Sequence, residues 1–357
     1  MTIMQPTILQ ILNLRKTAGD VGIEVECEGH GMFFVDSPFW KSEDDGSLRG
    51  MFPEERCEYI LKKPIPAKNV KAVLSDLSKA LAANGAVLDF SYRTSVHVHV
   101  NVQELNIDQV MNIAYTYLLL EEPLANFCGK QRKGCQFALR LVDAEGLLDY
   151  LGNVFEFGDV AIRNIPKDTI RYSAINFEAI QKYGSIEFRG MRGNLDVELL
   201  SQWVDILMNI REFAKKYDNP LALFKVFRSV GAKGFLAMAI GEDNTKVLTY
   251  PRIEQEIQRN FSLTIDLPVL FKKLDAKRKA PPPPKIEYFV GQKLSYKEAI
   301  AFITEYPGAH ACLTATGKLD EDGFSFYKLN EKLLQFITNK LNIEFKKLVP
   351  AQWDDFQ

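Results

Sequence analysis

The chain has 357 residues and a formal net charge of −2, with 46% hydrophobic and 25% charged residues. These values are ordinary for a globular protein of one large domain or two, with a core that needs no disulfide bonds. A nearly neutral chain has no global field to attract nucleic acid, and no segment approaches the roughly 18 consecutive apolar residues of a membrane span. We therefore expect no membrane contact, and no nucleic-acid partner except a modified nucleotide as substrate.

The cysteine content indicates the redox environment. The five cysteines are Cys27, Cys57, Cys128, Cys135 and Cys312. Their number is odd and no pair has the C-x-x-C spacing, which favours reduced thiols and predicts a cytoplasmic protein. Residues 1–16 lack the basic start and long apolar run of a signal peptide.

Hydrophobic periodicity predicts alternating strands and helices in the first 215 residues. In chain order the predicted elements are strands at Val21–Glu28 and Cys57–Leu61, a helix at Val70–Asn84, a strand at Ser95–Val102, a helix at Ile107–Leu120, strands at Arg171–Phe177 and Ser185–Arg189, and helices at Val197–Lys216, Leu221–Phe227, Ile253–Arg259 and Leu267–Lys279. Pro123 is expected to end the second of these helices, because proline lacks a backbone donor. Since the order is not a clean βαβ series, we predict an α+β fold with a largely antiparallel sheet.

A run of four prolines marks the predicted domain boundary. Pro281–Pro284 favours a stiff extended segment, so we divide the chain into a main domain at 1–280, a proline linker at 281–285 and a small C-terminal module at 286–357. In that module, apolar spacing predicts helices at Lys297–Thr304 and Asn330–Leu341. An extension packed on the main domain is the simpler interpretation, and a role in docking or homo-oligomerisation is the alternative.

The first predicted strand has an acidic face. Side chains alternate between the two faces of a strand, so Ile23 and Val25 point toward a core while Glu24, Glu26 and Glu28 point the other way. On its own, this pattern is typical of a solvated acidic surface.

The strand at Ser95–Val102 places two histidines on one face. Valines fill one face, and His97, His99 and Asn101 share the other. Half of the four histidines of the chain thus lie two residues apart, an arrangement that suits a metal or phosphate site as well as a structural role.

The strand at Ser185–Arg189 pairs an acid with a base on its polar face. Glu187 and Arg189 lie on the same side, and a shorter strand adds Glu58. An exposed ion pair between neighbours is worth only about 0–1 kcal/mol, so Glu187 and Arg189 alone do not indicate a site.

Together these strands predict a sheet with several carboxylates, two imidazoles and arginines on one face. Two like charges about 4 Å apart repel by about 4 kcal/mol at an effective dielectric constant near 20, so clustered acids call for divalent cations. Oxygen ligands with one imidazole suit Mg²⁺ or Mn²⁺, and arginine matches phosphate oxygens. This combination is typical of phosphoryl transfer.

The same segments carry a resemblance to a known superfamily. Gly22–Glu26, Ser95–Val100 and Ser185–Arg189 resemble, in this order, motifs of the glutamine synthetase and glutamate–cysteine ligase superfamily of carboxylate–amine ligases, and above all of its amidoligase branch, often found in phage and bacterial gene neighbourhoods. Shorter matching pieces are Trp40, Asp45–Leu48, Glu58, Glu121–Pro123, Arg171–Tyr172 and Asn176–Phe177. The matching stretch runs from Gly22 to Asn194, and nothing after about residue 215 contributes.

The resemblance implies a fold and a reaction. The implied fold is a glutamine-synthetase-like curved sheet with a polar catalytic face and helices packed on the other face. The implied reaction is an ATP-dependent ligation: ATP and Mg²⁺ or Mn²⁺ convert a carboxylate into an acyl phosphate, which an amine attacks to form an amide. The substrates would be small-molecule or peptide carboxylates and amines.

The resemblance also implies roles for individual residues. Metal ligands would be Glu24, Glu26, Glu58, His97 and Glu187; nucleotide or phosphate contacts would be His99, Arg189, Asn176 and Arg171; and catalytic residues would be Arg189, Arg192, Asp45 and Glu28. Arg189 and Arg192 would stabilise the transferred phosphate, and Glu28 or Asp45 would accept the proton of the amine. Arg132, Arg140 and Arg163 are all candidates to bind the substrate carboxylate.

Two other functions compete with the ligase. His97, His99 and a glutamate could hold Zn²⁺ or Fe²⁺ in a hydrolase or oxygenase that uses no nucleotide. Alternatively, the chain could be a non-catalytic interaction module with a ligase fold. The sequence contains no G-x-x-x-x-G-K-[ST] loop and no G-x-S-x-G motif, which argues against a P-loop enzyme and an α/β-hydrolase.

Overall fold

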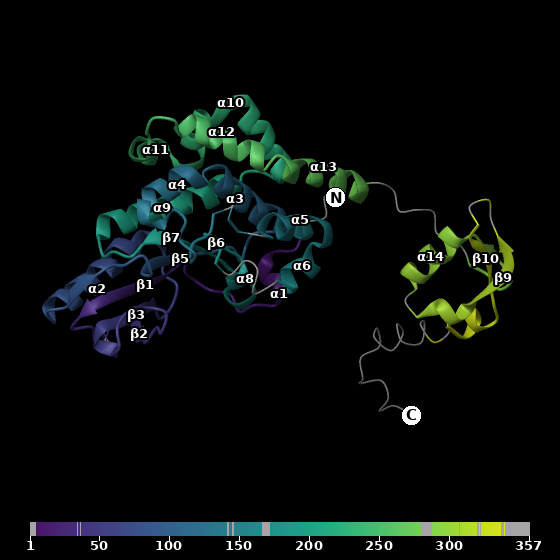
Figure 1. Cartoon of the computed structure of the whole chain (residues 1–357), viewed down its shortest axis with the longest axis horizontal. Coiled ribbons are helices and arrows are strands. Elements are labelled where there is room, and N and C mark those ends of the chain that lie inside the picture. The colour runs from purple at the N-terminus through teal and green to yellow at the C-terminus, as the bar shows by residue number, and fades with distance from the viewer. Residues whose placement is uncertain are drawn as a thin grey trace. The chain divides into compact units, whose positions relative to one another are not determined.

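A computed structural model (Figure 1) describes residues 5–33, 35, 37–140, 143–144, 146–165, 172–279, 288–306, 308–319, 321, 323–336 and 339. The chain divides into two compact units, Met1–Lys279 and Ala280–Gln357. The predicted proline linker and Arg171 lie outside the described residues. Among the described residues, no helix is both long and apolar enough to cross a bilayer.

The described part of unit 1 contains a seven-stranded antiparallel sheet. Its strands are β1 (Val21–His30), β2 (Trp40–Glu43), β3 (Arg56–Leu61), β4 (Val87–Asp89), β5 (Ser95–Asn101), β6 (Ile175–Asn176) and β7 (Ser185–Arg192). The order is β2-β3-β1-β5-β7-β6, and β4 pairs with the end of β1. The prediction of an α+β fold with an antiparallel sheet is confirmed, as are the strands that correspond to β1, β3, β5 and β7.

Several elements differ from the prediction. The strands β2 and β4 were not expected, and the strand predicted at Arg171–Phe177 is reduced to the two residues of β6 within the described part. The expectation that Pro123 ends a helix is wrong in detail. Helix α3 (Ile107–Leu119) ends before it, and Pro123 lies in the first turn of α4 (Glu121–Cys128), where a missing backbone donor costs no helical hydrogen bond.

Alternation along the strands separates an apolar face from a polar face. Ile23, Val25 and Cys27 of β1 are at most 2% exposed and belong to one continuous core with Val96 and Val98 of β5. Helices α2 (Val70–Ala83) and α9 (Val197–Ala214) contribute their apolar stripes to this core. The polar side chains of the same strands are left on the opposite face.

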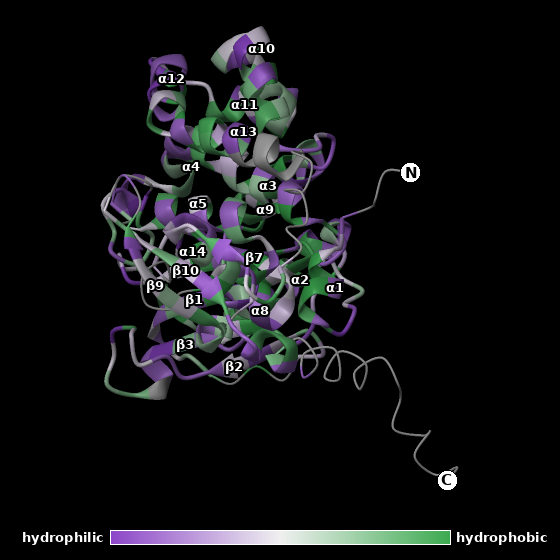
Figure 2. Cartoon of the chain, turned by 90° about the vertical axis from the view of Figure 1, so that its right-hand side faces the viewer, coloured by the Kyte–Doolittle hydropathy of each residue, from purple (hydrophilic) through white to green (hydrophobic). Residues whose placement is uncertain are grey.

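A second layer of helices covers the first. In Figure 1, α10 (Pro220–Ile240) and α12 (Ile253–Leu263) lie over α4 and α9, and α10 contacts α9 while α12 contacts α4. Figure 2 shows hydrophilic residues on α12, whose Ile257 and Phe261 are buried. The other helices in the described part of unit 1 are α1 (Ile8–Leu12), α5 (Leu147–Phe157), α6 (Asp159–Arg163), α8 (Glu178–Tyr183), α11 (Glu242–Leu248), α13 (Asp266–Lys279) and the short 3₁₀ turns Pro53–Glu55, Ala67–Asn69 and Lys130–Arg132.

Glycine is required where α8 passes into β7. Gly184 has φ +68°, and a Cβ added there would lie 2.4 Å from Cγ of Gln103. Only glycine adopts this backbone without strain and fits the space. The tight turn brings Tyr183, the last residue of α8, directly beside the start of β7.

Unit 2 has its own small core. Strands β8 (Lys293–Leu294), β9 (Leu313–Leu319) and β10 (Ser325–Leu329) form an antiparallel sheet in the order β8-β10-β9, next to α14 (Tyr296–Glu305) and the 3₁₀ turn Ala309–Cys312. The helix predicted at Lys297–Thr304 is confirmed by α14, whereas the sheet was not expected. Of the helix predicted at Asn330–Leu341, residues 332–336 are helical, and several of its later residues lie outside the described part.

Candidate active site

The strand register brings the predicted site residues into neighbouring positions. Glu24 of β1 lies opposite His97 of β5, and Glu26 of β1 lies opposite Glu58 of β3. On the other side of β5, His99 lies opposite Glu187 of β7. Four adjacent strands therefore contribute to one polar row, since directly opposed residues point to the same face.

The first candidate metal site consists of Glu24, His97 and Glu187. Nδ1 of His97 lies 3.1 Å from Oε2 of Glu24 and 3.4 Å from Oε1 of Glu187. Three possible ligand atoms, one from each residue, all lie within 4.8 Å of one another. This set of two carboxylates and one imidazole suits a hard divalent cation such as Mg²⁺ or Mn²⁺.

The second candidate metal site consists of Glu26 and Glu58, with His97 between the two sites. Ser95 donates its hydroxyl proton to Oε2 of Glu26 at 2.5 Å, and its Oγ lies 2.8 Å from Nε2 of His97. A hydroxyl has one proton, so Oγ must accept from the protonated Nε2. The lone pair of neutral His97 is then on Nδ1, which assigns this histidine to the first site.

Crowding of the acids shifts their pKa values. Burial and the charges of Glu24, Glu26 and Asp45 raise the pKa of Glu58 to about 8. Burial alone would also raise the pKa of Glu24, but the neighbouring imidazoles of His97 and His99 outweigh it and hold that pKa well below the usual range. A cation near Glu58 would offset the repulsion that keeps its proton bound.

Stability without metal should consequently fall between about pH 5 and pH 8. The folded pKa of Glu58 lies above its ordinary 4.5, so the native state holds an extra proton in this window and loses stability as pH rises through it. For His99, burial disfavours the charged form, but Glu24 raises the net pKa, and this contribution is also lost as pH rises. The lowered pKa values of Glu24 and Glu187 matter only below about pH 4.5.

Urea unfolding in chelator, followed by tryptophan fluorescence, measures this slope for unit 1, where Trp40 and Trp203 are buried. We expect a loss of about 2–4 kcal/mol from pH 5 to pH 8, most of which Glu58→Gln should remove. The control Glu156→Gln changes an exposed acid of α5 and should keep the wild-type slope. A Glu58→Gln variant with an unchanged slope would contradict the assignment.

Glu187 is held by two neighbours on its strand and on β6. Arg189 donates from Nη1 to Oε1 of Glu187 at 2.5 Å, and Asn176 donates from Nδ2 to Oε2 at 2.7 Å. Oδ1 of Asn176 accepts from the backbone of Glu178. Asn176, predicted to contact the cofactor, thus lies in the site and orients a metal-ligand candidate, while its cofactor contact stays a prediction.

A β-bulge directs Arg192 to the polar face. Val98 pairs with Phe188 and Val96 with Met191, so two residues of β7, Arg189 and Gly190, lie opposite His97. Without the extra residue, Met191 and not Arg192 would share the face of Arg189. Nη1 of Arg192 donates to the carbonyls of Phe127 and Cys128 at the end of α4, so one nitrogen of the guanidinium group already has hydrogen-bond partners.

Glu28 and Asp45 lie at the Glu58 end of the row. Glu28 is 3% exposed and accepts a hydrogen bond from the backbone of Arg49 at 2.7 Å. Asp45 accepts from the backbone and the hydroxyl of Ser47, and its charge contributes to the raised pKa of Glu58. Neither acid is in a metal-ligand group of the described residues, which leaves their predicted role in proton transfer open.

The three arginines proposed to bind a substrate carboxylate have different environments. Arg132 is 2% exposed and donates to the carbonyls of Tyr92 and Arg189. Arg140 pairs with Glu122 at 2.5 Å, and Arg163 is exposed at the end of α6. Arg132 therefore fixes the backbone beneath the site, a positioning role that the sequence analysis did not identify.

An open polar pocket of about 380 Å³ adjoins the first metal site. Its lining residues come from β1, β5, β6, β7 and α8 and are Glu24, His99, Asn176, Glu178, Ala179, Gln181, Lys182, Tyr183, Glu187 and Arg189. Nε2 of His99 lies 3.2 Å from Oε1 of Glu24 but has no partner with hydrogen-bond geometry, and its Nδ1 lies 3.3 Å from Oγ of Ser185. The volume is within the usual range for small-ligand pockets.

Comparisons with known proteins do not identify a family: no family model matches the chain, and no curated protein matches it significantly.

Proposed function

We propose that this protein is an ATP-dependent carboxylate–amine ligase that forms an amide bond with the help of divalent metals. The observation that carries the proposal is the convergence of Glu24, His97 and Glu187, next to Glu26 and Glu58, on one face of an antiparallel sheet. Arg189 lies at the edge of the same cluster. This combination suits phosphate chemistry better than any other single function.

The architecture supports a glutamine-synthetase-like fold. Helices cover the apolar face of the sheet, and the polar face carries the candidate ligands.

The residues present fit two divalent cations. Glu24, Glu187 and Nδ1 of His97 would hold one, and Glu26 and Glu58 would hold the other. When bound, Mg²⁺ or Mn²⁺ would offset the charge of the ATP phosphates and polarise the γ-phosphoryl group. Arg132 and Ser95 maintain the geometry, through the backbone of Arg189 and the side chain of Glu26 respectively.

In the first half of the reaction, an oxygen of the substrate carboxylate attacks the γ-phosphorus, the bond to the β-phosphate oxygen breaks, and ADP leaves. Arg189 is the only arginine that lines the pocket in the described residues, and its guanidinium is the group positioned to stabilise charge on the transferred phosphoryl oxygens. His99, with an unpartnered Nε2, can donate to a phosphate oxygen when protonated.

In the second half, an amine attacks the acyl carbon, inorganic phosphate leaves, and the amine proton passes to a carboxylate. Glu28 and Asp45 are the two acids that the sequence resemblance assigns to this step, and neither belongs to a metal-ligand group of the described residues. Asp45 is the more exposed of the two, and Glu28 is committed to the backbone of Arg49. We therefore assign proton acceptance to Asp45.

A zinc or iron enzyme is the weaker alternative. Each candidate group in the described part of the chain contains one histidine, His97, with two glutamates. Both imidazoles contact the carboxylate of Glu24, but no group of the described residues contains His97 and His99 together as possible ligands of one ion. The geometry thus favours hard cations over Zn²⁺.

Thermal unfolding with Mg²⁺ or Mn²⁺, alone and with ATP, ADP or a non-hydrolysable ATP analogue, tests the proposed function. A ligand that binds only the folded state raises the melting temperature by mass action. At a ligand concentration of 100 times its Kd, the free energy of unfolding increases by about 2.7 kcal/mol. We expect the largest shift with metal and nucleotide together. A shift that occurs with Zn²⁺ or Fe²⁺ and does not depend on nucleotide would support the hydrolase or oxygenase. The absence of any shift would support a non-catalytic module.

A further inference from the structure

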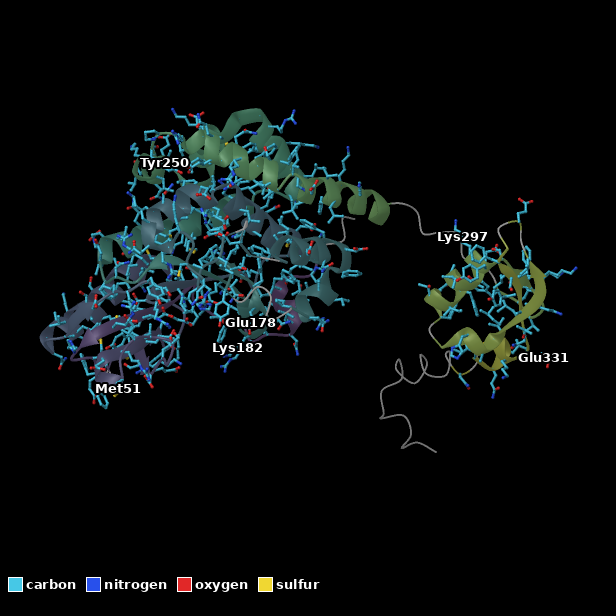
Figure 3. All side chains as sticks on the ribbon, in the orientation of Figure 1. Met51, Glu178, Lys182, Tyr250, Lys297 and Glu331 are labelled. Atoms are coloured by element: carbon cyan, nitrogen blue, oxygen red, sulfur yellow. The ribbon has the colours of Figure 1, made fainter. Side chains whose placement is uncertain are left out.

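The pocket beside the first metal site has one wall that the proposed chemistry does not use. Glu24, Glu187 and Arg189 form the wall where phosphates would be bound. Helix α8 adds Tyr183, Lys182 and Glu178 to the lining of the same pocket. Glu178 and Lys182, labelled in Figure 3, lie one turn apart on this short helix.

Tyr183 presents an aromatic ring to this space. Its side chain is 50% exposed, although it adjoins buried strands. The ring lies edge-on to His99, with centroids 6.0 Å apart and an interplanar angle of 88°. The contact with His99 and the tight turn at Gly184 hold the ring beside the phosphate end of the pocket.

The partly exposed ring contacts the ammonium group of Lys182, which is easily displaced. Nζ of Lys182 lies 4.7 Å from the ring centroid of Tyr183. A cation over an exposed tyrosine is a weak contact, and the lysine stem is flexible, whereas a planar base stacked on an aromatic ring gains more. A flat heterocycle can therefore replace the ammonium group.

We propose that Tyr183 is the stacking platform for the base of a nucleoside triphosphate whose phosphates are bound at Arg189 and the first metal site. This inference rests on the proposed function and adds the base pocket to it. The charges of the lining residues match the two ends of such a ligand. Arg189 and a cation held by the acids would bind the triphosphate, and the aromatic ring of Tyr183 would stack on the uncharged base. Lys182, freed from the ring, stays near the mouth of the pocket and can pair with a phosphate oxygen.

A comparison of MgATP with Mg²⁺–tripolyphosphate isolates the contribution of the base. Titration calorimetry on the full chain gives both affinities for wild type, Tyr183→Ala and Tyr183→Phe. The matched control is Phe157→Ala, which removes a 55% exposed aromatic ring at the end of α5, outside the pocket. We expect wild type, Tyr183→Phe and the control to bind MgATP about tenfold more tightly than tripolyphosphate.

Tyr183→Ala should lose this tenfold preference and bind tripolyphosphate as wild type does. If Tyr183→Ala keeps the preference, or if wild type has none while still binding both ligands, the base pocket is elsewhere and only this inference fails. If wild type binds neither ligand in Mg²⁺, the proposed function fails together with it.

Discussion

Glu187→Gln should reduce ATP-dependent turnover by at least about 1,000-fold while unit 1 remains folded. Glu187 contributes a carboxylate oxygen 3.4 Å from Nδ1 of His97 and is 6% exposed. Glutamine keeps the shape of the side chain but removes the negative charge that a divalent cation requires. The amide also places donor hydrogens next to Arg189 and Asn176, whose groups donate to Glu187 in the wild type.

Tryptophan fluorescence of the buried Trp40 and Trp203 shows whether the variant is folded, and two further measurements test the loss of metal. ADP formation is measured with an acid–amine pair found by screening for phosphate release, and free Mn²⁺ is counted by electron paramagnetic resonance. Glu187→Gln should bind Mn²⁺ much more weakly than wild type, whereas Glu156→Gln should match wild type in both measurements. Near-normal turnover of a folded Glu187→Gln protein would rule out Glu187 as a metal ligand.

Arg189→Lys should lower kcat by about 100-fold or more and leave Mn²⁺ binding within about threefold of wild type. The guanidinium fork can contact Glu187 and a phosphate oxygen at the same time, because its N–H groups diverge in one plane. Arg189 donates to Glu187 from Nη1 and to the carbonyl of Phe137 from Nε, at 3.4 Å. A lysine ammonium keeps the charge but cannot make these contacts and hold phosphate together.

The control for this variant is Arg228→Lys, which changes an exposed arginine of α10 outside the site. Its kcat should be unchanged. Full activity of Arg189→Lys would show that the fork has no part in the reaction, and a parallel loss of Mn²⁺ binding would assign Arg189 a structural role at the metal site instead.

The polar face of the sheet could be predicted because it depends on local alternation alone. Glu24 and Glu26 had to share a face, as did His97 and His99, once each segment was a strand. That β1 lies between β3 and β5 and places Glu26 opposite Glu58 could not be read from the sequence. The register depends on packing of the whole apolar face, which a single strand does not encode.

Other features required the tertiary structure. The β-bulge in β7, which turns Arg192 toward the polar face, cannot be predicted from the alternation of polar and apolar residues. Ser95 precedes the two histidines on the same face, and this spacing is a signal that could have identified it as the group that orients His97. Arg132 is separated from its carbonyl partners by 40 or more residues, so no local pattern indicates its role.

The helices after residue 215 were predicted as separate short segments, and their arrangement was not. Pro220–Ile240 forms α10 as two helical parts around Gly231, whose φ of +70° interrupts the helical backbone. In unit 2, the strands β9 and β10 have few buried residues, so their sequences lack the hydrophobic alternation that would predict them.

The most direct test of the central claim is an anomalous difference map of crystals grown with Mn²⁺ and a non-hydrolysable ATP analogue. The proposed function predicts two manganese peaks on the polar face of the sheet, one bound by Glu24, His97 and Glu187 and one beside Glu26 and Glu58. The absence of manganese from both positions, in crystals where these side chains are ordered, would contradict a metal- and ATP-dependent ligase.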